Sequence, residues 1–141
     1  MFIGHFAPAF VAAAVSPERP RLGMMFVAAQ LVDWAFFALS IVGVEHMRIV
    51  DPPASVMSPI DFYHMPYTHS LFGAAIWAAV MLGVVALQRR DLKLAALAGL
   101  VVLSHWLMDW LVHVPDLTLD GTPPKLGLGL WNFPWIAIPL E

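Results

Sequence analysis

The sequence predicts an all-α membrane protein, a polytopic transmembrane helix bundle of about four membrane helices, including a short N-terminal one. Hydrophobic residues make up 60% of the 141 residues and charged residues only 12%, whereas a soluble domain has about 25% charged residues. A chain this short cannot bury so much apolar surface in a water-facing fold, so the excess must face lipid. Long apolar runs between polar turns organise residues 1–141 as a single membrane domain.

The first two apolar runs differ in length. Residues 2–15 are interrupted by His5 and Pro8, and at about 1.5 Å per residue a helix here reaches only about 22 Å, so we expect a short or re-entrant helix. No basic stretch precedes this run, which argues against a cleaved signal peptide. After the proline-containing turn at 16–21, residues 22–46 predict a full-length membrane helix.

A long outer loop is predicted over 47–66, which contains four prolines. Loops of this length are uncommon and are often functional. The next helix is expected over 67–88, with Thr68 as its N-cap. Residues 92–114 predict another membrane helix, which ends because Pro115 cannot continue the hydrogen-bond ladder.

A last apolar segment over 130–140 carries Trp131 and Trp135, and tryptophan is typical of the membrane interface. The sequence stops at Glu141, before this segment reaches the length of a membrane span. We therefore expect a C-terminal segment that is either interfacial or a truncated span.

Basic residues predict the orientation in the membrane, because cytoplasmic loops are enriched in lysine and arginine. Two turns, 16–21 and 88–93, hold five of the seven Lys and Arg residues and fall on the same side of the bundle. We expect both turns to be cytoplasmic and the loop 47–66 to face outward. The net charge of −3 and the lack of a basic run argue against a nucleic-acid partner, so membrane lipid is the expected one.

His105, Asp109 and His113 form the strongest functional pattern in the sequence. Their i, i+4, i+8 spacing places all three on one face of a helix. An Asp at the centre of a membrane helix costs roughly 2.5–3.5 kcal/mol. The face is therefore expected to point into the bundle, where it serves either as polar glue between helices or as a functional site.

Two further polar residues fall at a compatible depth in the membrane. Asp33 is the second acid inside a predicted span, and His69 lies in the first turn of the helix over 67–88. An unpaired Asp at that depth would be protonated, whereas a metal ion would keep it ionised. Several other residues are expected to be solvated or to lie at helix ends, outside any site: His5, Glu45, His46, Asp61 and His64.

The chain has no cysteine, so a metal site must use His, Asp or Glu. Imidazole and carboxylate donors suit Zn²⁺ best, and Mn²⁺ or Fe²⁺ also accept them. Three or more such ligands with an open position activate water at neutral pH. We expect Asp33 and His113 to act as catalytic residues or additional ligands. The sequence has neither an HExxH nor a GxSxG motif, which argues against a zincin or a serine hydrolase.

Two short motifs carry a family resemblance. Pro66-Tyr67-Thr68-His69-Ser70-Leu71 and Ser104-His105-Trp106-Leu107-Met108-Asp109 resemble the signature of the YdjM-like membrane-bound metal-dependent hydrolases, which are bacterial inner-membrane proteins. The stretches 1–5, 65–70 and 127–132 are further similar to a branch of small membrane proteins in that group. The resemblance implies a bacterial inner-membrane location and a metal held by His69, His105 and Asp109. Asp33 stands alone where the family typically has an Asp-x-Asp-His cluster.

The sequence leaves three functions open. The first is a metal-dependent hydrolase that cleaves an ester or phosphoester of a lipid-like substrate from the periplasmic side. The second is a non-enzymatic accessory or structural subunit of a larger membrane complex, in which the polar residues are either glue between helices or cofactor ligands. Histidines in membrane helices can bind haem or chlorophyll-type pigments, and a pocket for one could be lined by Trp34, Trp77, Trp106 and Trp110. The third is a proton or ion pathway through Asp33, His105 and Asp109, which with so few spans requires a homo-oligomer.

Overall fold

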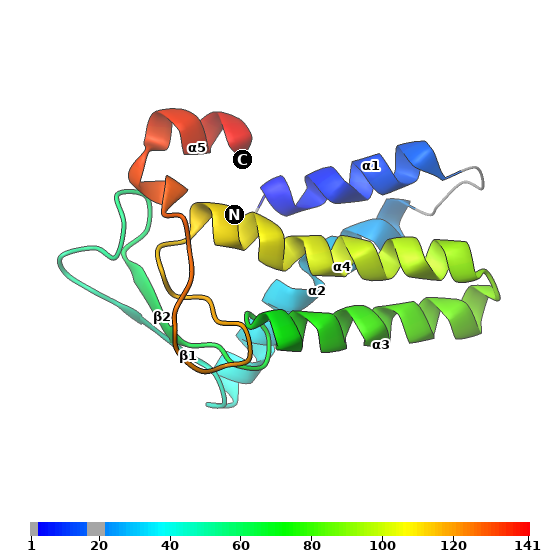
Figure 1. The fold of residues 1–141 in the computed structure, drawn as a ribbon, viewed down its shortest axis with the longest axis horizontal. Coiled ribbons are helices and arrows are strands. Elements are labelled where there is room, and N and C mark those ends of the chain that lie inside the picture. Colours follow the sequence, from blue (N-terminus) through cyan, green and yellow to red (C-terminus); the bar gives the residue numbers. More distant parts are fainter. Residues whose placement is uncertain (1–2, 17–21) are drawn as a thin grey trace.

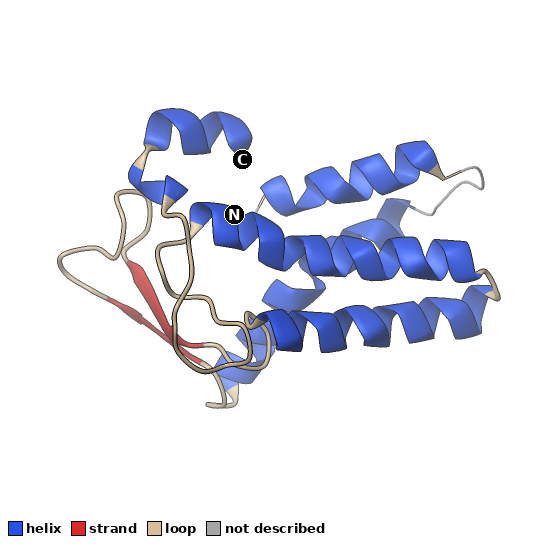
Figure 2. Cartoon of the chain, in the orientation of Figure 1, coloured by secondary structure: helices blue, strands red, loops and turns tan. Residues whose placement is uncertain are grey.

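The computed structural model describes residues 3–16 and 22–141, and most of them belong to helices that run side by side (Figure 1). Two short strands form a hairpin at one end of the helices (Figure 2). In chain order the elements are η1 (Gly4–Phe6), α1 (Ala7–Val15), α2 (Leu22–Ile41), β1 (His46–Ile49), β2 (Ile60–His64), α3 (Leu71–Arg89), α4 (Leu92–Val112), η2 (Leu130–Asn132) and α5 (Pro134–Leu140).

Three helices in the described part of the chain, α2, α3 and α4, are long and apolar enough to cross a membrane. They contain 20, 19 and 21 residues, and about 20 apolar residues span the hydrocarbon core of a bilayer. The segment Gly4–Val15 is apolar but shorter. The predicted polytopic helix bundle with a short N-terminal helix is therefore confirmed, and a small two-stranded sheet is added to it.

Small side chains allow the helices to pack closely. The buried core includes Ala28 and Ala29 of α2 and Ala95 and Ala98 of α4. Between membrane helices no hydrophobic driving force acts, and small residues favour association because they permit close van der Waals contact. Helix α4 contacts α1, α2 and α3, so side chains on its inner face meet all the other helices of the bundle.

Helix α2 ends at Ile41, earlier than the end predicted at 46. Gly43 adopts a left-handed conformation with φ of 74°, and glycine commonly ends helices in this way because it has no Cβ to clash. The chain then turns into β1. The turn carries Glu45 into the interior, where it is fully buried, instead of leaving it at an exposed helix end.

The region 47–66, predicted as a loop, contains an antiparallel hairpin made by β1 and β2. Arg48 pairs with Asp61 across the strands, and their side chains form an ion pair with an N···O distance of 2.7 Å. The sequence does not predict the hairpin because its strands are too short and too exposed to show a clear alternation of apolar and polar residues. The hairpin lies at the end of the bundle where α3 begins (Figure 1).

The start of α3 differs from the predicted one. The hydroxyl of Ser70 accepts a hydrogen bond from the N–H of Gly73 at 2.9 Å, so Ser70 is the N-cap and α3 begins at Leu71 rather than at 67. The prediction that Thr68 caps this helix is therefore wrong. Thr68 and His69 lie in the turn before the helix, and both are buried.

The segments predicted over 92–114 and 130–140 also differ from the observed helices. Helix α4 stops at Val112 rather than at 114, because His113 is already extended with ψ of 148° ahead of Pro115. The segment 130–140 is not one helix, since Phe133 separates η2 from α5 with φ of −124° and ψ of 74°. Helix α5 starts at the next residue, a proline, which suits the first turn of a helix.

The two turns predicted to be cytoplasmic lie at one end of the bundle, as far as the structure describes them. Ser16 at the end of α1 lines a common cavity with Arg89, Arg90 and Lys93 of the α3–α4 turn. Residues 17–21 of the first turn lie outside the described residues. The hairpin lies at the opposite end (Figure 1). This arrangement agrees with two turns on the same side, and the choice of the cytoplasmic side stays a prediction from charge.

Candidate metal centre

The polar stripe of α4 faces the interior of the bundle. His105, Asp109 and His113 have exposed fractions of 1%, 1% and 4%. Nε2 of His105 lies 3.2 Å from Oδ2 of Asp109, and Nε2 of His113 lies 3.4 Å from Oδ1 of the same carboxylate. Asp109 therefore contacts the histidines one turn before and one turn after it, as the spacing predicts.

Asp33 of α2 and His69 of the turn before α3 join this stripe. Nε2 of His69 lies 3.5 Å from both Asp33 Oδ1 and Asp109 Oδ2. Nε2 of His105 lies 3.4 Å from Asp33 Oδ1. Two imidazoles and two carboxylates from three separate parts of the chain thus meet at one place. The structure brings together all five residues singled out in the sequence: Asp33, His69, His105, Asp109 and His113.

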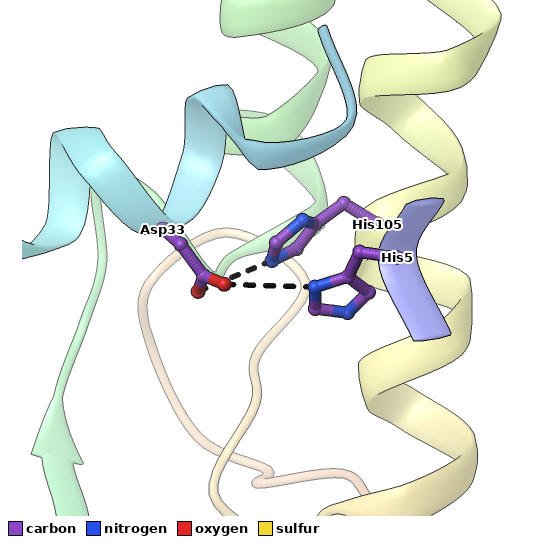
Figure 3. Close-up of side chains that lie close together, drawn as sticks. All are labelled: His5, Asp33 and His105. Carbon is purple, nitrogen blue, oxygen red and sulfur yellow. Dashed lines mark ion pairs between the residues drawn. The ribbon is translucent and has the colours of Figure 1, made fainter. Parts of the chain in front are cut away.

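His5 also belongs to this group, although the sequence favours a solvated or capping role for it. Its ring lies beside that of His105, with centroids 3.6 Å apart, and both rings point toward Asp33 (Figure 3). Nε2 of His5 lies 3.0 Å from Asp109 Oδ1, and its Nδ1 lies 3.5 Å from Asp33 Oδ2. The expectation for His5 is wrong because the segment η1 contacts both α2 and α4 and buries the ring.

The hydrogen-bond network assigns the tautomers of His69 and His105. Nδ1 of His105 lies 2.9 Å from the carbonyl oxygen of Ala29, which can only accept, so Nδ1 carries the proton. Nδ1 of His69 lies 2.8 Å from the hydroxyl of Thr68, and that hydroxyl donates to Glu45 at 2.6 Å. Nδ1 of His69 must then donate to Thr68. In the neutral form of both rings, Nε2 presents a lone pair toward the carboxylates.

These lone pairs lack a matching donor within the described residues. Nε2 of His105 and Nδ1 of His5 are buried and have no hydrogen-bond partner there. The nearest polar atoms are carboxylate oxygens, which accept and do not donate when ionised. A buried acceptor facing another acceptor is unfavourable unless a proton or a cation lies between them. The group therefore favours either a proton or a metal ion between the imidazoles and the carboxylates.

The spacing of the donor atoms fits a divalent metal ion. Two sets of three residues have ligand atoms that all lie within 4.8 Å of one another: His69 with His105 and Asp109, and His5 with Asp33 and His105. Neighbouring ligands at about 2.0–2.1 Å from a tetrahedral ion lie about 3.3 Å apart, close to the observed separations of 3.2–3.5 Å. Both sets need Nε2 of His105, and one nitrogen lone pair binds one ion, so the two sets describe a single centre.

His113 differs from the other histidines because carboxylates flank both of its nitrogens. Its Nδ1 lies 3.1 Å from Asp116 Oδ1, and its Nε2 faces Asp109. Burial alone lowers the pKa of His113, but the two carboxylates outweigh it and raise the pKa to about 9. The ring also packs against Trp131, with centroids 4.2 Å apart. This position allows His113 to hold a proton beside the centre.

A pocket of about 300 Å³ reaches the centre from the side of α2 and the hairpin. One wall is polar and contains Asp33, His69, Asp109 and His113. The rest is mostly apolar and aromatic, with Phe36, Phe37, Met57, Ser58, Ile60, Phe62, Trp131 and Glu141. The pocket therefore combines a polar reaction surface with an apolar surface that suits a hydrocarbon group.

The four tryptophans considered for a pigment pocket do not line this one. Trp34 is about half exposed, with an exposed fraction of 49%, while Trp106 is buried. The indole N–H of Trp106 donates to the carbonyl oxygen of His69 at 3.1 Å, and that of Trp77 donates to the carbonyl oxygen of Tyr67 at 3.1 Å. Two of the tryptophans thus hold the turn that carries His69.

The comparisons with known proteins agree with the motifs. The family described as YdjM inner membrane protein matches residues 1–124. No curated protein and no solved structure gives a significant match. Because the match covers most of the chain and includes every residue of the candidate centre, the protein belongs to the YdjM inner membrane protein family and is a multi-pass protein of the inner membrane.

Proposed function

We propose that the protein holds one divalent metal ion through His69, His105 and Asp109 and uses it to hydrolyse an ester bond in a lipid-like substrate. The observation that carries the proposal is the unpartnered Nε2 of buried His105, which faces two carboxylates. Nitrogen and oxygen donors without sulfur suit Zn²⁺, and also Mn²⁺ or Fe²⁺. Asp33 and His5 are in reach as further ligands.

The arrangement supports a hydrolytic role for the pocket. A divalent ion in such a site acts as a Lewis acid and makes water a nucleophile at neutral pH. His113 lines the pocket, and its Nδ1 is held by Asp116, so it is placed to transfer a proton. Asp33 lines the pocket and contacts His69 and His105, and its side chain is 14% exposed, the largest value in the group.

The lining of the pocket supports an amphiphilic substrate. Phe36 is buried beside Asp33, whereas Phe37 is 43% exposed on a membrane-spanning helix and so lies at the lipid-facing side. A hydrocarbon chain can follow these aromatic side chains while its ester reaches the polar wall. With the predicted orientation, the substrate enters from the periplasmic side. Carboxylic esters and phosphoesters both fit this description.

Metal analysis of the detergent-purified protein tests the first part. We expect close to one divalent ion per chain, loss of that ion in His105→Ala, and its retention in His64→Ala, because His64 is exposed on the hairpin. Protonated imidazoles could satisfy the same contacts as polar glue between helices. In that case the wild-type protein would carry no metal and its melting temperature would not change in chelator, and the proposal would be wrong.

Hydrolysis is tested separately in nanodiscs that contain fluorogenic lipids. We expect the metal-loaded protein to release the fluorophore from a carboxylic ester or a phosphoester lipid, and chelator to stop the release. His113→Ala should keep the metal and lose most of the rate. A metal-loaded protein that cleaves neither lipid would overturn the hydrolase proposal and leave the metal centre standing.

A further inference from the structure

Glu45 is a fully buried carboxylate on the turn between α2 and β1. Its oxygens accept three hydrogen bonds from one short stretch of chain. The backbone N–H groups of Tyr67 and Thr68 donate to Oε1 at 2.8 and 2.9 Å, and the Thr68 hydroxyl donates to Oε2 at 2.6 Å. Within the described residues, no lysine or arginine forms an ion pair with Glu45. The carboxylate is thus held entirely by the turn that carries His69.

Thr68 passes this interaction on to His69. A hydroxyl group has one proton, and here it points to Glu45. The oxygen then has only lone pairs left for His69 Nδ1, 2.8 Å away, so Nδ1 must be the donor. If the hydroxyl proton pointed to Nδ1 instead, Nε2 would carry the proton and could not bind a metal. The group that accepts the Thr68 hydroxyl proton therefore decides which ring nitrogen of His69 is free to bind a metal.

Two of the other histidines near Asp109, His105 and His113, do not need such a relay. Nδ1 of His105 faces a backbone carbonyl, and Nδ1 of His113 faces the carboxylate of Asp116. Both partners only accept, so Nδ1 carries a proton in each ring without a relay. His69 instead faces a hydroxyl, which can donate or accept. The Glu45 carboxylate takes the hydroxyl proton, so the hydroxyl can only accept a hydrogen bond from His69.

We propose that Glu45 is a positioning residue that acts through Thr68 to keep Nε2 of His69 available as a metal ligand. The inference rests on the proposed metal centre and assigns a role to a residue that does not touch the ion. Partners that orient metal-binding histidines typically change metal affinity by about 10–100-fold when they are removed. A change of that size is expected here.

The Thr68 hydroxyl can be removed and restored with little change in shape. Thr68→Val has the same shape and no hydroxyl, whereas Thr68→Ser keeps the hydroxyl. We expect Thr68→Val to bind Zn²⁺ about 10–100-fold more weakly in competition with a chelator, and Thr68→Ser to bind about as tightly as the wild type. Glu45→Gln should also weaken binding, because an amide can turn its NH₂ group toward the hydroxyl. All measurements use the full chain in detergent.

Nitrogen NMR of the metal-free protein, with ¹⁵N-labelled histidine, reads the tautomer itself. We expect His69 to carry its proton on Nδ1 in the wild type and to lose this preference in Thr68→Val. Wild-type affinity in Thr68→Val, while His105→Ala still loses the metal, would overturn the relay and leave the proposed function intact. A His69 ring protonated on Nε2 in the wild type would overturn the relay as well. If neither the wild type nor any variant binds a metal, the proposed function itself is wrong.

Discussion

The two ends of the bundle accommodate charge in opposite ways. At the end predicted to be cytoplasmic, Arg89, Arg90 and Lys93 are exposed around a tight turn. At the other end, Asp109 and its histidines are buried and contact one another. Exposed charges are stabilised by water and contribute little to one another. Buried charges depend on their partners, so the loss of one affects the whole group.

Replacing Asp109 at the buried end should have the largest effect on metal binding and stability. Asp109→Asn keeps the shape but removes the charge that faces His5, His105 and His113. We expect loss of the metal and a loss of roughly 3–5 kcal/mol of stability, the usual cost of removing one partner of a buried charge pair. Thermal unfolding in detergent measures the second effect.

Asp91→Asn is the matched control at the basic end. Asp91 is the N-cap of α4 and accepts from the backbone N–H of Lys93 and Leu94, and asparagine caps helices about as well as aspartate. We expect little change in its melting temperature. Equal melting temperatures for the two variants would contradict the contrast between the ends of the bundle.

Acid should weaken metal binding at the buried end. Each ligating histidine must lose a proton before its nitrogen can bind a metal, so affinity falls as the pH is lowered. We expect at least roughly a tenfold loss between about pH 8 and about pH 5.5. Isothermal titration with Zn²⁺ at several pH values measures this. An affinity independent of pH would show that imidazole is not among the ligands.

The smallest effect is expected in the exposed turn. Arg90 has φ of 54°, in the left-handed region that glycine tolerates best. Arg90→Gly should therefore stabilise the protein by up to about 1 kcal/mol, since a side chain costs about that much in this conformation. Arg89→Gly, at the last residue of α3, should instead cost up to about 1 kcal/mol because glycine is a poor helix former. Two changes of the same sign would show that local backbone conformation does not set stability here.

The sequence predicts those parts of the molecule that depend on local patterns. The three long apolar runs become α2, α3 and α4, because length and hydropathy alone decide whether a helix can cross a bilayer. The grouping of His105, Asp109 and His113 follows from helical periodicity. Asp33 and His69 could be predicted to lie near them because all of these residues fall at a compatible depth in the membrane.

The parts that the sequence did not predict depend on contacts between distant segments. His5 lies in a short run with no polar neighbour at helical spacing, so no pattern points to its place beside Asp109. Glu45 follows a predicted helix end, and its role appears only when the turn carries it to Tyr67 and Thr68. The polar character of His5 inside an apolar run is the signal that could have raised its priority.

The contact between His5 and Asp109 joins positions 104 residues apart in the chain. A ribosome adds about 5–20 residues per second, so roughly 5–20 s pass between the synthesis of one residue and the other. At the start of that time His5 has been made, while α4, which supplies His105, Asp109 and His113, has not. The centre can therefore assemble only after α4 has been made, and a chain that stops before α4 lacks three of its residues.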